Sequence, residues 1–509
     1  MAGQEDPELA ASVGLEVSQV VELPRPRTPG AEDLMRMYAV ITVTVHRRGD
    51  AQGPPAGPAS PIGRATPAAT ATPAAPAATE RDPAPGAARP RLAEVLLIDH
   101  SSSMVMPPSR LAAARAAAVS ALARIPDGAL FALVAGGDRT AMIYPRRAGL
   151  AVAHAESRAA AEAALYDCTP GGGTAMGTWL ERARHLFREL PPADSGYVRH
   201  ALLLTDGKNE PGYETRAELH DRIERCARAF ECDVVGIGDA WETEELLLIA
   251  GTLGGRTRAV EDLTRLPDEL AALTGRAAER DVTGLRLRLY HRAGVRPHSF
   301  EQVHPTRAAL APVHVDLSGV ETGAGGPVQE YDIGPCGEET RAYLLCVGAP
   351  YDPSQLGKEL LLTEVEVDTD GTAGTLRLPA AQPVLMRWTD DVDLYSRLDP
   401  QVAHYRHEEE LHRTFEEACA ELKSGRRAPA EALLGTAWRL AAEAGDTAMQ
   451  DHLRRLVRVQ GGAQGEQAEV ELLPHIAKFD LEAARIQSST TVLPGGARHT
   501  PRRPGGGRR

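Results

Sequence analysis

A regular alternation of short apolar runs and longer amphipathic runs, between residues 94 and 277, is the feature that most constrains the fold of this 509-residue chain. The strand-like runs are 94–99, 130–135, 140–144, 200–205, 233–238 and 257–260. The helix-like runs are 109–124, 156–166, 175–190, 215–229, 242–250 and 264–277. Short apolar strands that alternate with helices are buried on both faces of their sheet. The pattern therefore predicts an α/β fold with a doubly wound, mostly parallel sheet, in which 140–144 forms an antiparallel edge.

The sequence on both sides of this region predicts a different architecture. Residues 281–392 contain several strand-like runs with few helix-like runs between them, which is typical of a β-sandwich. Two further strand-like runs, 15–23 and 35–46, have no other partner in the sequence. We therefore expect residues 15–48 to complete the β-sandwich, so that the α/β domain is inserted within it. Residues 49–90 are rich in Ala, Pro and Thr and predict an extended linker.

The C-terminal part of the sequence changes pattern twice. Between residues 398 and 460, apolar side chains recur at helical spacing and predict a small helical segment. From residue 488 to 509 the chain is polar and contains Pro, Gly and Arg, and this composition predicts a disordered tail. Thr490 and Thr491 lie in this tail and are candidate phosphorylation sites, because a phosphothreonine there would be readable by an arginine-bearing pocket.

Polar residues follow two of the predicted buried strands and a glycine-rich loop. They are Asp99, Ser101 and Ser103 after the run at 94–99, Thr174 after three glycines, and Asp206 after the run at 200–205. In an open parallel sheet, ligands bind beyond the carboxyl ends of the strands, so we expect these segments to converge. Two carboxylates and three hydroxyls form an all-oxygen set, which suits a hard cation such as Mg²⁺, with Mn²⁺ or Ca²⁺ as alternatives.

The order Asp99-x-Ser101-x-Ser103, Thr174 and Asp206 resembles the complete metal-ion-dependent adhesion site (MIDAS) of von Willebrand factor A domains, over residues 91–277. The resemblance implies that the two serines and Thr174 bind the metal directly, and that the two aspartates act directly or through water. The sixth ligand would be a Glu or Asp of a partner protein. His100 fills a variable position of the motif and is expected to be a solvent-facing loop residue.

The leading functional hypothesis is a Mg²⁺-dependent protein-protein interaction module without enzymatic activity. No P-loop, HExxH, GxSxG or strand-associated GxGxxG motif occurs in the sequence. Intracellular bacterial proteins with such a domain, which the chain also resembles, are associated with Ser/Thr kinase, phosphatase and forkhead-associated-domain signalling or with ATPase chaperone systems. Two alternatives therefore stay open: a phosphorylation-dependent signalling scaffold acting through Thr490 or Thr491, and a regulatory subunit of an ATPase chaperone or chelatase.

Charge, hydropathy and cysteine usage restrict the expected environment. A net charge of −14 argues against nucleic acid as the main partner. No apolar run of 18 or more residues is present, so no membrane span is expected, and the acidic start of the sequence does not look like a signal peptide. The six cysteines form no CxxC pair and suit a reducing interior. We therefore expect a cytoplasmic protein.

Overall fold

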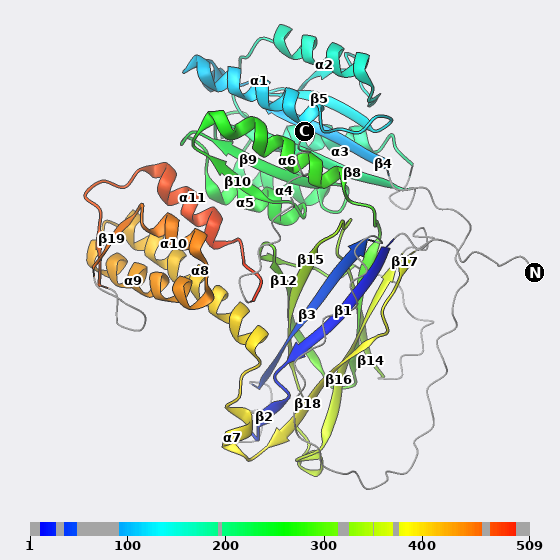
Figure 1. Cartoon of the computed structure of the whole chain (residues 1–509), viewed down its shortest axis with the longest axis vertical. Helices are drawn as coiled ribbons and strands as arrows, with labels where there is room; N and C mark the ends of the chain where they lie inside the picture. Colours follow the sequence, from blue (N-terminus) through cyan, green and yellow to red (C-terminus); the bar gives the residue numbers. More distant parts are fainter. Residues whose placement is uncertain are drawn as a thin grey trace, which may run out of the picture.

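The computed structural model describes residues 11–26, 35–47, 91–191, 196–313, 325–349, 351–369, 376–460 and 469–494. The predicted linker at 49–90 and the end of the chain after residue 494 lie outside these ranges. Three parts are visible in Figure 1: an α/β domain, a pair of β-sheets, and a group of C-terminal helices. In the ranges that are described, no helix combines the length and the apolar character needed to cross a membrane.

The α/β domain is built on a seven-stranded sheet with the strand order β10-β9-β8-β4-β5-β6, in which β7 also pairs with β5. Its strands are β4 (Arg91–Asp99), β5 (Leu130–Gly136), β6 (Ala141–Tyr144), β7 (Ala151–Val152), β8 (Tyr197–Thr205), β9 (Glu231–Ile237) and β10 (Thr257–Val260). Strands β10, β9, β8, β4 and β5 are parallel, whereas β6 and β7 run antiparallel to β5. The predicted mostly parallel sheet with an antiparallel edge is therefore confirmed.

Helices cover both faces of this sheet, as the continuous apolar strands require. They are α1 (Pro108–Leu122), α2 (Ala155–Asp167), α3 (Met176–Phe187), α4 (Arg216–Cys226), α5 (Thr243–Thr252) and α6 (Leu266–Ala278). One apolar core joins the sheet to α1, α2 and α6, and a second core joins its other face to α3, α4 and α5. Alternate residues of β4 enter the two cores, for example Leu96 the first and Leu97 the second, so this strand is buried on both sides.

Two further sheets share one apolar core. The first has the order β13-β12-β15-β3-β1-β17 and the second the order β14-β11-β16-β18-β2. The first sheet contains β1 (Ala11–Gln19), β3 (Arg36–Arg47), β12 (Arg296–His304), β13 (Ala308–Ala309), β15 (Thr340–Gly348) and β17 (Leu376–Arg377). The second contains β2 (Glu22–Pro24), β11 (Leu285–Arg292), β14 (Gly325–Asp332), β16 (Glu359–Thr369) and β18 (Gln382–Thr389). Strand β3 lies between β1 and β15 and is antiparallel to both, so strands from before and after the α/β domain are hydrogen-bonded together.

The C-terminal helices are α8 (Pro400–Lys423), α9 (Arg427–Ala444), α10 (Thr447–Leu453) and α11 (Lys478–Ser488), preceded by the short α7 (Val392–Tyr395). A hairpin of β19 (Val457–Gln460) and β20 (Glu469–Leu472), which the sequence analysis missed, lies between α10 and α11. Helix α11 also packs against the α/β domain. The rings of Phe479 and Trp241 meet there edge-on, with 6.2 Å between their centroids. The C-terminal helices are therefore joined to the α/β domain by a buried contact.

Residues 488–494 differ from the predicted disordered tail. Ser488 is the last residue of α11, and Thr490 forms an isolated β-bridge with Thr306. Thr491 is only 5% exposed; its hydroxyl donates to the carbonyl of Val303 at 2.5 Å and its amide to that of Pro305. The prediction is wrong for this segment because partners far away in sequence satisfy its polar groups, and composition does not reveal such partners.

Candidate metal centre

The candidate metal residues follow the two central strands of the α/β sheet. Asp99 ends β4, and Asp206 comes directly after its neighbour β8. The chain leaves β4 toward α1 on one face of the sheet and leaves β8 toward α4 on the other face. This divergence of the connections creates the crevice in which open α/β sheets bind their ligands.

Asp99 is fully buried and holds the start of the loop. One of its carboxylate oxygens accepts a hydrogen bond from the amide of Ser101 at 2.8 Å, and the other accepts from the hydroxyl of Thr205 at 2.6 Å. Burial raises the pKa of Asp99 to about 6, although these hydrogen bonds favour the charged form. Because both oxygens are engaged, Asp99 fixes the orientation of the loop that carries the two serines.

The hydroxyls of Ser101 and Ser103 and the carboxylate of Asp206 form a continuous polar group. The two serine Oγ atoms are 2.8 Å apart, and Ser103 Oγ donates to Asp206 Oδ1 at 2.6 Å. Ser101 and Asp206 are buried, whereas Ser103 is exposed. The group therefore opens to solvent at Ser103 and carries its negative charge at a buried position.

Thr174 reaches the same place from the glycine-rich loop. A hydrogen bond from its amide to Glu210 Oε1 (3.1 Å) and one from the Glu210 amide to its carbonyl (2.9 Å) hold its backbone. A Cβ atom built on Gly207 would lie 3.6 Å from Thr174 Oγ1 and 3.9 Å from Ser103 Oγ. Both hydroxyls therefore lie beside Gly207. The Thr174 side chain forms no hydrogen bond with the described part of the chain, and its oxygen is available to a ligand.

Glycine is required in the loop before Thr174. Gly172 has a φ of +82°, which disfavours other residues, and a Cβ there would overlap the carboxylate of Asp138 in the β5–β6 turn. The carbonyl of Gly172 accepts hydrogen bonds from both the amide (3.0 Å) and the hydroxyl (2.9 Å) of Ser102. The glycine-rich loop is thereby attached to the serine loop, which brings Thr174 to the two serines.

His100 differs from its prediction as a solvent-facing residue. It is only 3% exposed, and its Nδ1 lies 3.1 Å from the carbonyl of Ile98. Its backbone connects two neighbouring loops, because its amide donates to Gly136 and its carbonyl accepts from Gly171. Burial lowers the pKa of His100, so its ring is uncharged at neutral pH. The prediction is wrong because these loop contacts turn the side chain inward, and they cannot be read from the local sequence.

Arg110 belongs to the site although sequence reasoning missed it. Its Nη1 atom lies 2.9 Å from Asp206 Oδ2, and its Nη2 atom lies 4.0 Å from Asp239. The family pattern contains only oxygen donors, so it gives no signal for a cation. The sequence does place Arg110 a few residues after the two serines, in what is the first turn of α1. This proximity was the only sequence feature that could have pointed to it.

Two buried polar residues that the sequence analysis also missed hold the start of α3 behind Thr174. The side chain of Asn209 accepts from the amide of Met176 at 3.1 Å, and that of Glu214 accepts from the amide of Gly177 at 2.8 Å. These groups satisfy amides that a helix leaves without internal partners at its start. They fix the end of the glycine-rich loop.

The residues present fit a divalent cation. Three hydroxyls and two buried carboxylates converge, and one of the hydroxyls has no other partner in the described ranges. Such an oxygen set matches the preference of hard cations. Ser101, Ser103 and Thr174 would hold the ion, and Asp99 and Asp206 would supply the compensating negative charge.

Residues 94–259 match the model of the von Willebrand factor type A domain family. This part of the chain is a von Willebrand factor type A (VWA) domain. The structure of a von Willebrand factor type A protein from Catenulispora acidiphila is similar to almost the whole chain, with a TM-score of 0.76 and 27% identity over 96% of this chain and 99% of that one. The fold around the VWA domain is therefore shared as well.

Two of the other similar structures resemble the chain less closely. The ArnB paralog VWA2 from Sulfolobus acidocaldarius is 11% identical with a TM-score of 0.48, over 94% of this chain and 98% of that one. Proximal thread matrix protein 1 from the mussel byssus, described with a zinc-occupied MIDAS motif, is 23% identical with a TM-score of 0.31, over 37% of this chain and 46% of that one. No curated protein matches the sequence significantly.

Proposed function

We propose that this protein binds a partner protein through a divalent cation, Mg²⁺ in the first place, held at the MIDAS-type site of its VWA domain. The observation that carries the proposal is the convergence of the Ser101, Ser103 and Thr174 hydroxyls beside the buried Asp206 carboxylate. When bound, the cation supplies a positive charge with an open coordination position, to which a Glu or Asp side chain of the partner can bind.

The chain's own residues set the charge and the geometry of this site. The Asp99 and Asp206 carboxylates are offset in part by Arg110, so these three side chains together carry about one net negative charge before a cation binds. A divalent cation leaves the assembled site positive, which favours an acidic group of a partner. Asp99 keeps the serine loop in place, and Glu210 does the same for Thr174.

A calorimetric titration with Mg²⁺ and Mn²⁺ tests the proposal. Thr174→Ala and Ser103→Ala are expected to lose metal binding, because each removes a hydroxyl that faces the site. Ser102→Ala is the matched control, because its hydroxyl lies in the same loop but donates to Gly172. The proposal fails if wild type binds neither ion. It also fails if the partners captured from source lysate stay bound after chelation or bind Thr174→Ala equally well.

We further propose that the protein acts by binding rather than by catalysis, and in the cytoplasm of a bacterial cell. All six cysteines are free, and five of them are buried, which suits a reducing compartment. A free-thiol count on protein purified from its source without reductant tests the compartment. Formation of disulfides in that protein would contradict it.

A signalling role through the C-terminal segment is a second candidate, and Thr490 carries it. Thr490 is partly exposed and precedes Leu493 by three positions, the spacing that forkhead-associated domains read. Thr491 is buried, so it is a poor kinase substrate while the segment stays packed. Phosphorylation mapping by mass spectrometry on the native protein tests this role, and an unmodified Thr490 under all growth conditions would remove it.

A further inference from the structure

A cavity of about 1570 Å³ lies where the VWA domain, the β-sheets and the C-terminal helices meet. Its walls come from β10 and α6 of the VWA domain, from the ends of β12 and β15 in the first of the two sheets, and from α10 and α11. Sites for small ligands typically have about 300–1,000 Å³. The cavity therefore has room for a molecule of nucleotide size, and it is separate from the metal centre.

Several arginines line the VWA side of this cavity, among them Arg256, Arg258 and Arg276. Arg256 is paired with Glu339 at 3.5 Å. Arg258 and Arg276 form no hydrogen bond or ion pair with the described part of the chain, and Nη2 of Arg276 is buried without a partner. Burying a cation without a counter-ion lowers the free energy of unfolding, unless a bound anion neutralises its charge.

Burial, followed by the positive charge of Arg256, lowers the pKa of Arg276 to about 10. The pKa of Arg258 is lowered by the same two causes, in the same order. Nearby carboxylates act in the opposite direction without restoring the usual values. Asp233 and Glu269 thus offset the effects of burial and of Arg256 on the two guanidinium groups only in part.

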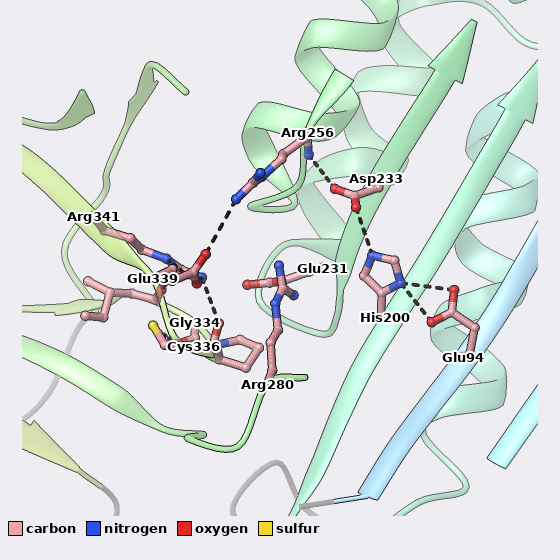
Figure 2. A network of polar contacts seen from close by, with 12 residues as sticks. Glu94, His200, Glu231, Asp233, Arg256, Arg280, Gly334, Cys336, Glu339 and Arg341 are labelled. Atoms are coloured by element: carbon pink, nitrogen blue, oxygen red, sulfur yellow. Dashed lines mark hydrogen bonds and ion pairs between the residues drawn. The ribbon is translucent and has the colours of Figure 1, made fainter. Parts of the chain in front are cut away.

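Figure 2 shows that carboxylates near Arg256 are already bound to other residues, among them Asp233 and Glu339. Asp233 accepts from the amide of Arg256 at 2.7 Å and lies 3.4 Å from His200, which also contacts Glu94. Glu339 joins Arg256 to Arg341, and Glu231 pairs with Arg280.

Glu269, the remaining carboxylate that influences both arginines, lies 3.9 Å from Arg265. The network therefore leaves Arg258 and Arg276 for an incoming anion.

We propose that this cavity binds a phosphate-bearing small molecule of nucleotide size, whose phosphoryl oxygens contact Arg258 and Arg276. The planar guanidinium group offers several donors in a fixed fork and binds phosphate in a bidentate manner. Here two such groups come from different elements, β10 and α6, and they are close enough for the charge of Arg258 to lower the pKa of Arg276. Because walls from all three parts of the protein enclose the cavity, a bound molecule would contact each of them.

Calorimetry on the full chain tests the proposal, with pyrophosphate and ATP as probes and a chelator present to exclude the metal centre. Wild type is expected to bind at least one probe. The Arg258→Gln and Arg276→Gln variants are each expected to bind that probe at least tenfold more weakly. Arg276→Lys keeps the charge but loses the fork and should give an intermediate effect. Arg265→Gln is the matched control, since Arg265 lines the same cavity but is largely exposed and has Glu269 beside it.

Thermal unfolding without ligand separates a binding role from a structural one. Each Gln variant should unfold at the wild-type temperature or above it, because it removes a cation with no counter-ion in the described ranges. Each probe that binds should raise the unfolding temperature of wild type and of Thr174→Ala equally. The proposal is overturned if wild type binds neither probe at millimolar concentration, or if the Gln variants bind as tightly as wild type.

Discussion

Arg110 and Asp206 form an ion pair of 2.9 Å inside the candidate metal centre. The guanidinium group occupies one oxygen of the carboxylate while Ser103 donates to the other, so both oxygens of Asp206 are engaged. Asp206 is fully buried, and a charge close to it interacts more strongly than in bulk water. Arg110 therefore opposes the binding of a cation, and its removal should be visible in metal affinity.

Arg110→Met is expected to tighten Mg²⁺ binding by about tenfold, since removing a nearby like charge is worth roughly 1–2 kcal/mol at a partly buried site. Titration calorimetry measures the change. Arg110→Lys keeps the charge and serves as the control, with an affinity near that of wild type. Weaker binding by Arg110→Met would show instead that the ion pair with Asp206 organises the site.

The buried contact between Glu94 and His200 predicts a stability that depends on pH. Burial alone would lower the pKa of His200, but Glu94 and Asp233 outweigh it and raise the pKa to about 9. A raised histidine pKa stabilises the fold fully below the unfolded value, about 6.5, and this contribution is lost as pH rises through about 9. Wild type should therefore lose roughly 3 kcal/mol of unfolding free energy between these pH values.

Chemical denaturation between these pH limits checks this prediction. His200→Gln should be less stable than wild type at neutral pH, and its stability should change little over the same window. His220→Gln is the matched control, because His220 is exposed on α4. A wild-type stability that stays constant or rises with pH would show that the His200 ring is neutral in the fold.

A pair of glycines near α5 provides a test of packing. Gly251 lies in α5 with open space around its Cα, so Gly251→Ala should stabilise the protein by about 0.5–1 kcal/mol. Gly255 lies in the turn before β10, where a Cβ would overlap the backbone carbonyl of Cys232 in β9. Gly255→Ala should destabilise the protein by about 2–3 kcal/mol. Thermal unfolding of both variants measures the difference, and equal effects would contradict the close approach of the two backbones.

Local patterns predicted the VWA domain well because its elements are defined by their own periodicity. The run at 94–99 and the helix-like run at 109–124 correspond to β4 and α1 within a few residues. Strand β12 was missed because its sequence, RPHSFEQVH, does not alternate, and only Phe300 and Val303 are buried. Its pairing with β15, 40 or so residues later in the chain, defines it instead.

The same distinction applies to the candidate site. The oxygen donors were found because their spacing forms a motif, and the structure brings Ser101, Ser103 and Asp206 into direct contact. The inward turn of His100 and the ion pair of Arg110 depend on contacts between separate loops and helices. Such contacts leave no periodic signal, so they could be found only from the structure.

Thr490 and Thr491 are adjacent in sequence but should respond differently to negative charge. Thr491→Glu places a carboxylate where a buried hydroxyl donates to Val303, so it should destabilise the protein by about 2–3 kcal/mol or more. Thr490→Glu changes a partly exposed side chain and should cost less than about 1 kcal/mol. Thermal unfolding compares the two, with Thr491→Val isolating the loss of the hydrogen bond. Equal tolerance would mean that the segment after α11 leaves its packed position in solution, and both threonines would then be open to a kinase.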